Sequence, residues 1–76
     1  MKFLDLQTGG YSAHTTIEGL YSMICEDYCE CEEGYDILDE KDGKMKCLNC
    51  WRLNNLESIT TKEMIRVIES KEYKIE

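Results

Sequence analysis

The sequence predicts a single small domain of the α+β class, and three observations support this prediction. Two stretches carry apolar residues at helical spacing, an Asp-Gly turn signal lies between two short segments of strand character, and the 76 residues include five cysteines. A chain this short buries only a modest core, so the hydrophobic gain and the loss of chain entropy nearly cancel. It therefore needs a cross-link, and the cysteines can supply one. No proline, repeat or low-complexity linker divides residues 1–76, which we expect to form one unit.

Two helices are predicted from capping boxes that precede apolar stripes. Thr15 and Glu18 have the spacing of a capping box, and the apolar pattern behind them predicts a helix from about residue 16 to 27. A second box at residues 60–63 precedes a predicted helix over about 61–70.

The two ends of the chain are predicted to form strands that pair with each other. Residues 2–6 form a short apolar segment, and residues 73–75 alternate between apolar and charged side chains. Residues 51–57 are expected to form a short third helix.

A β-hairpin is predicted over residues 34–48. Asp42 and Gly43 are a strong signal for a two-residue loop, because glycine readily adopts the positive φ that tight hairpin turns require. A loop of these two residues would place Asp39 directly opposite Lys46, as a favourable cross-strand charge pair.

The charge of the chain is strongly negative and uneven. The formal net charge is −7, and the segment from residue 26 to 42 contains Lys41 as its one basic residue beside nine acids: Glu26, Asp27, Glu30, Glu32, Glu33, Asp36, Asp39, Glu40 and Asp42. Nucleic-acid phosphates and anionic membrane surfaces are repelled by such a field. We expect no membrane association and no direct nucleic-acid binding, and a basic protein surface as the favoured partner.

Four of the cysteines form two close pairs, Cys29-x-Cys31 and Cys47-x-x-Cys50, separated by the length of a hairpin. Zn²⁺ prefers four soft ligands in a tetrahedron, and two such pairs supply them at little entropic cost. Cys50 precedes the predicted helix at 51–57, whose N-terminus would stabilise a thiolate. The sequence therefore predicts one structural Zn²⁺ held by Cys29, Cys31, Cys47 and Cys50.

With the hairpin between them, these pairs resemble a treble clef over about residues 29–57, although the first pair is Cys-x-Cys instead of the usual Cys-x-x-Cys. The expected fold is thus a small zinc-stabilised α+β domain with a treble-clef-like β-hairpin and two or three short helices. One alternative ligand set is open: Cys25 lies four residues before Cys29, and on a continuing helix these two could ligate together and displace Cys31.

The odd cysteine count and the absence of a secretory signal at the N-terminus favour a reducing compartment, so we expect a cytoplasmic protein. His14 is the only histidine, and Cys25 has no evident base partner, so no enzymatic activity is expected. Trp51, next to Cys50, could shield a metal or anchor a partner.

The expected function is a non-catalytic, zinc-stapled protein-interaction module that acts as a regulator or inhibitor. Its small size and acidity resemble, in general character, inhibitors encoded by phages or mobile elements that occupy basic grooves of nucleic-acid-binding host proteins. One alternative is a redox-responsive thiol switch, since the two cysteine pairs also resemble the zinc redox switch of a holdase chaperone family. The other is a nucleic-acid-binding zinc finger. The oligomeric state is open.

Overall fold

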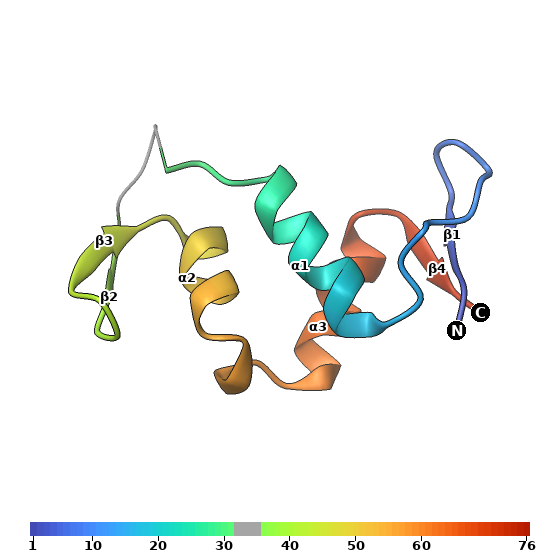
Figure 1. Cartoon of the computed structure of the whole chain (residues 1–76). Helices are drawn as coiled ribbons and strands as arrows, with labels where there is room; N and C mark the ends of the chain where they lie inside the picture. The colour runs from blue at the N-terminus through green and yellow to red at the C-terminus, as the bar shows by residue number, and fades with distance from the viewer. Residues whose placement is uncertain (32–35) are drawn as a thin grey trace.

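The computed structural model describes residues 1–31 and 36–76 and confirms the predicted α+β class. Its elements, in chain order, are β1 (Phe3–Asp5), α1 (Ile17–Asp27), β2 (Ile37–Asp39), β3 (Lys44–Lys46), α2 (Leu48–Asn54), a 3₁₀ turn η1 (Leu56–Ser58), α3 (Thr61–Ser70) and β4 (Tyr73–Ile75). The molecule is elongated, 39 × 24 × 17 Å, with the helices in the middle and one two-stranded sheet at each end (Figure 1). None of the helices described here has the length and apolar character that crossing a membrane requires.

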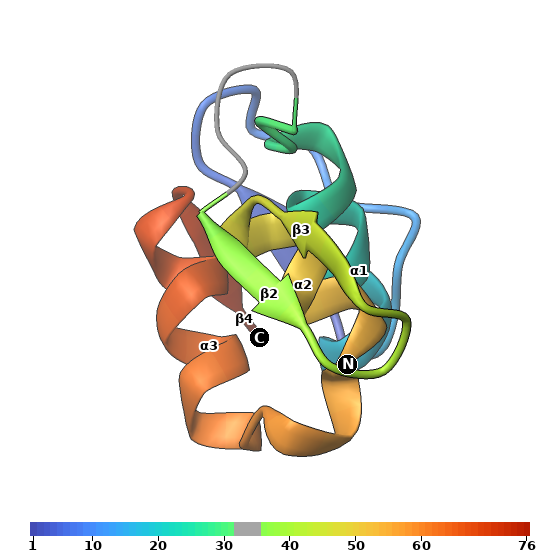
Figure 2. The same cartoon turned by 90° about the vertical axis from the view of Figure 1, so that its left-hand side faces the viewer.

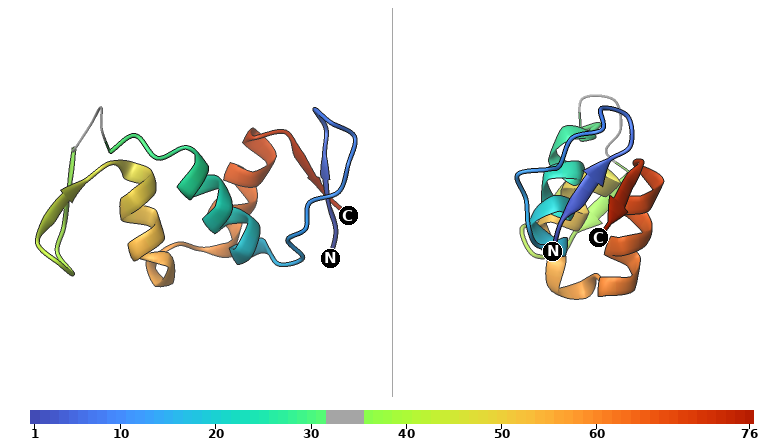
Figure 3. Two further views of the ribbon diagram at one scale, coloured as in Figure 1. Left: turned by 45° about the horizontal axis from the view of Figure 1, so that its top comes forward. Right: turned by 90° about the vertical axis from the view of Figure 1, so that its right-hand side faces the viewer.

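The terminal strands pair as predicted. β1 and β4 are antiparallel, with Phe3 opposite Ile75. The backbones of Lys2 and Glu76 exchange two further hydrogen bonds of 3.2 and 2.8 Å. The two chain ends therefore lie side by side at one end of the molecule (Figure 3).

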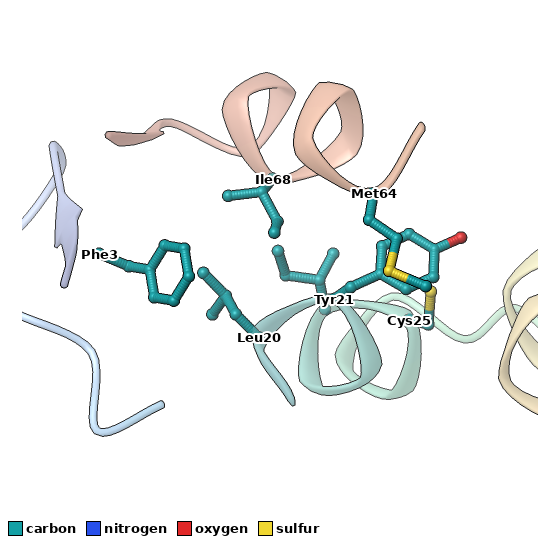
Figure 4. Close-up of a cluster of buried hydrophobic side chains, with 7 residues drawn as sticks. Phe3, Leu20, Tyr21, Cys25, Met64 and Ile68 are labelled. Atoms are coloured by element: carbon teal, nitrogen blue, oxygen red, sulfur yellow. The ribbon is translucent and has the colours of Figure 1, made fainter. Parts of the chain in front are cut away.

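The core lies between α1 and α3 and is closed at one end by β1 (Figure 4). Its buried side chains are Phe3, Leu20, Tyr21, Ile24, Cys25, Met64 and Ile68. The α1 members recur at one-turn spacing, so a single face of that helix is removed from water. Burying such side chains is the main favourable term in folding.

The two long helices begin at threonine caps, and one of these was predicted one residue too early. The cap of α1 is Thr16, whose backbone is extended and whose hydroxyl accepts the Gly19 amide at 3.1 Å; Thr15 was predicted. The prediction for α3 is confirmed, because the Thr60 hydroxyl accepts the Glu63 amide at 3.2 Å.

The hairpin exists, but its predicted register is wrong by two residues. Asp39 lies opposite Lys44, and residues 40–43 form a four-residue loop. Gly43 has a φ of 71° and donates its amide to the Asp39 carbonyl at 2.8 Å, which closes the longer loop. Lys46 nevertheless reaches the Asp39 carboxylate, at 2.9 Å, as a diagonal neighbour on the same face. Residues 34 and 35 of the predicted hairpin lie outside the described residues.

The third helix begins three residues earlier than predicted. α2 covers Leu48–Asn54, and its continuation is the separate turn η1, whereas a single helix over 51–57 was predicted. The reason is the capping residue: the Cys47 sulfur caps α2, with an extended backbone at φ −71° and ψ 163°. Cysteine is not among the residues from which a helix start is ordinarily predicted.

Candidate metal centre

The structure brings Cys29, Cys31, Cys47 and Cys50 into one cluster, with all four Sγ atoms within 4.8 Å of one another. Cys50 Sγ lies 3.0 Å from the sulfurs of both Cys29 and Cys31, and Cys47 Sγ lies 3.8 and 3.5 Å from the same two. Four sulfurs bound tetrahedrally at about 2.3 Å from Zn²⁺ would be about 3.8 Å apart. Three of these four separations are shorter than that distance, so a small expansion along them would accommodate the ion.

The second cysteine pair is positioned by the start of α2. Cys47 is the N-cap, and Cys50 lies in the first turn, so one helical turn places both sulfurs on the same side. The Cys50 amide lies 3.4 Å from Cys47 Sγ and donates to it. The Glu30 amide donates to the same sulfur from the opposite segment, also at 3.4 Å. These two N–H groups would support a thiolate in a metal-bound state.

The first cysteine pair lies on the segment that leaves α1. The helix ends at Asp27, with Tyr28 as its C-cap, and the Cys29 amide then donates to the Glu26 carbonyl at 3.3 Å. Asn49, on α2, donates its side-chain amide to the Tyr28 carbonyl at 2.6 Å. This hydrogen bond fixes the end of α1 against α2 and so brings Cys29 to the cluster.

The surroundings of Cys47 and Cys50 shift the pKa values of these two thiols in opposite directions. Burial by itself raises the pKa of Cys47, but the amide hydrogen bonds from Cys50 and Glu30 outweigh it and lower this pKa to about 6. Hydrogen bonding to Cys29 and Cys31 raises the pKa of Cys50. The Cys47 thiol therefore loses its proton more easily than the Cys50 thiol, and a bound cation would displace the proton of Cys50.

A buried carboxylate, Asp39, locks the hairpin onto the helix that carries Cys50. Its side chain is fully buried and accepts Asn54 Nδ2 at 2.7 Å and Lys46 Nζ at 2.9 Å. The Lys41 amide donates to its second oxygen at 3.1 Å. The hydrogen bonds from Asn54 and Lys46 hold the pKa of Asp39 well below its usual range, against the opposing effect of burial.

The sequence predicts the charge pair of Asp39 with Lys46, but not the burial of Asp39 or its hydrogen bond to Asn54 of α2. Strand alternation did contain a signal. Asp39 shares a face with Ile37, and the outer face carries the exposed pair Leu38 and Met45. An acid on the inner face of a hairpin needs buried partners.

Cys25 does not join the cluster. It is fully buried in the α1–α3 core, where burial raises the pKa of its thiol. The alternative ligand set required α1 to continue to Cys29, but the helix ends at Asp27. His14 is likewise not part of the cluster. Trp51 is half-buried and lines a hollow beside β2.

No protein-family model, curated protein or solved structure matches this chain.

Proposed function

We propose that Cys29, Cys31, Cys47 and Cys50 bind one structural Zn²⁺ and that the domain so stabilised is a non-catalytic protein-interaction module. The observation that carries the proposal is the convergence of four thiols, drawn from two segments about 20 residues apart, within 4.8 Å of one another. Four thiols are a ligand set typical of structural zinc. The knuckle, the hairpin and a cysteine-capped helix favour a treble-clef description of this end of the molecule.

The absence of catalysis is proposed from the ligand set. Four thiolates complete the tetrahedral coordination of zinc, whereas catalytic zinc sites keep one position for water or substrate. Such a site stabilises the fold and would not activate water. Zinc would then act by holding the segment after α1 against α2.

The interaction role is proposed from the charge. Glu26, Asp27, Glu30, Asp36 and Glu40 are all exposed, and they surround or adjoin the segments that hold the cluster. Lys46 pairs with Asp42 and with the buried Asp39, so the charge of these two acids is partly compensated within the domain. The remaining negative surface favours a basic protein partner, and a regulator or inhibitor of such a protein fits a domain for which we propose no catalysis.

Native mass spectrometry tests the metal site. We expect one zinc ion per chain as purified, and loss of that ion in Cys50→Ser. Cys25→Ala is the matched control, since it removes a thiol of the core, and it should retain the metal. A metal-free wild type with reduced cysteines contradicts the proposal, as does loss of zinc in Cys25→Ala alone.

A redox-responsive zinc switch is the second candidate, favoured by the 3.0 Å separation of Cys50 Sγ from its two neighbours. Oxidation of two zinc-bound thiolates to a disulfide would transfer two electrons to a peroxide, which takes up two protons from the solvent and is reduced to water, and would remove two zinc ligands. Peroxide should then release zinc, and a dithiol reductant should restore binding. Zinc that stays bound through peroxide treatment excludes this candidate.

A further inference from the structure

An open groove lies beside β2, on the side of the hairpin that faces the turn after α2. Ile37 and Leu38 line it from β2, and Trp51, Asn55 and the last two residues of η1 line it from the other segment. We call this feature the hairpin groove; its volume is about 460 Å³, within the range of sites that accept ligand groups. Figure 2 looks onto this end of the molecule, with the hairpin in front of α2.

The apolar surface of the groove continues onto the outer face of the hairpin. Leu38 is 53% exposed, and its direct cross-strand neighbour Met45 is 46% exposed. The hairpin has only six strand residues, so two exposed large apolar side chains form a substantial part of its surface. An aromatic side chain, an aliphatic strand edge and open access are typical of a surface that receives an anchor side chain from a partner.

The rim of the groove is negatively charged. Glu40 and Glu57 line it, and the exposed Asp36 precedes its first wall residue. Lys41 also lines the groove, but its ammonium group pairs with Glu57 and donates to the Asn54 carbonyl at 2.7 Å. Among the described residues at this rim there are three acids and one lysine, so the Lys41–Glu57 pair leaves the charge of the other two acids, Asp36 and Glu40, uncompensated. This charge favours a basic occupant, and the net charge of −7 opposes a second copy of the chain.

We propose that the hairpin groove binds a segment of a partner protein in which an aliphatic or aromatic side chain is flanked by lysine or arginine. The anchor side chain packs against Trp51 and Leu38, and the flanking cations meet Glu40 and Glu57. The proposal rests on the interaction role proposed above and gives that role a surface and a class of partner.

A set of three short peptides tests the binding chemistry. The first has a Leu-Phe-Leu core with two lysines on each side; the second replaces the lysines with glutamates, and the third replaces the core with serines. Trp51 is the only tryptophan in the chain and none of the peptides contains one, so its fluorescence reports the groove directly. We expect the lysine peptide to bind with a Kd of about 1 mM or lower, and the other two to bind at least roughly tenfold more weakly.

Two matched pairs of variants locate the site. The Leu38 side chain is exposed in the free chain and would be covered by the peptide. Leu38→Ser should therefore weaken binding by roughly tenfold, because this apolar contact is lost. Leu6→Ser, at a similarly exposed leucine after β1, should leave binding unchanged. Glu40→Gln should weaken it about two- to threefold at low salt only, since exposed charges are screened. Its control, Glu69→Gln on α3, should have no effect.

Several results would overturn the groove proposal: no binding of the lysine peptide at about 1 mM, equal binding of the glutamate peptide, or an equal loss in Leu6→Ser. Self-association that Leu38→Ser abolishes would assign the groove to a second copy instead. Native mass spectra of the same samples show whether zinc is bound, so failure of the groove proposal can be distinguished from failure of the zinc proposal. A chain that holds zinc and ignores the peptide overturns the groove alone, and a metal-free chain that binds the peptide overturns the zinc site alone.

Discussion

The two ends of this molecule are held together by different chemistry. Between α1 and α3, seven buried side chains form a continuous core. At the other end, β2, β3 and α2 bury no aliphatic or aromatic side chain. Among the described residues of that end, the buried side chains are Asp39, Cys47 and Asn55. Removing water from apolar groups can stabilise the first end, whereas the second depends on specific bonds to sulfur and to one carboxylate. The comparison teaches that one short chain can divide its stabilisation between an apolar core and a set of specific polar contacts.

Metal removal should have the largest effect and should act on one end only. A structural zinc site in a small domain contributes about 10–16 kcal/mol of apparent binding free energy near neutral pH. Chelation should therefore collapse the amide NMR signals of residues 37–54 into the range of an unfolded chain, while α1 and α3 keep their dispersed signals. Loss of dispersion throughout would show that the apolar end has no independent stability. Unchanged spectra would show that the hairpin end does not need a metal.

Ile68→Ala should have the next largest effect, at the other end. Ile68 is fully buried on α3, and truncating such a side chain costs about 2–5 kcal/mol, a large part of the stability of a small domain. Thermal unfolding followed by circular dichroism should show a clear fall in Tm, with one zinc still bound below the transition. Leu6→Ala is the control, because Leu6 is 58% exposed and its loss should change stability by less than about 0.5 kcal/mol. Loss of zinc in Ile68→Ala would mean that the cluster depends on the core.

Asp39→Asn should have a smaller effect that depends on pH. The pKa of folded Asp39 is lowered below the usual value of about 3.9, so its contribution to stability is complete above about pH 4 and is lost as the pH falls through the folded pKa. Denaturation at pH 7 should find Asp39→Asn less stable than the wild type, and the difference should shrink below about pH 4. Acid also protonates the thiols in both proteins, so only their difference is informative.

The exposed Asp36 provides the matched substitution. Asp36→Asn should unfold at the same denaturant concentration as the wild type at pH 7. An equal loss of stability in both variants would remove any special role for the buried Asp39.

The sequence predicted the apolar end better than the hairpin end, and the reason is physical. The stripe of α1 and the cap at Thr60 follow from periodicity and local capping, which act over a few residues. The strand character of the two chain ends is also local, whereas their pairing is a contact between residues distant in sequence. The hairpin register depends on Gly43 and on the bonds of Asp39 to α2, which is distant in sequence. The start of α2 depends on a cysteine acting as a cap, and cysteine is not among the preferred N-cap residues. The grouping of four cysteines was predicted from spacing alone, whereas the burial of Cys25 required knowing where α1 ends.

The pairing of the two chain ends determines how the domain responds to mechanical force. β1 and β4 are antiparallel, and Lys2 and Glu76 are hydrogen-bonded beside each other. A pull on both ends therefore loads the strand pairs one after another, like a zipper, instead of shearing them together. Tension reaches α1 and α3 only after this sheet has opened, and it reaches the cysteine cluster last. The domain should thus yield first at low force at its termini, while the proposed metal site and the hairpin groove remain unloaded.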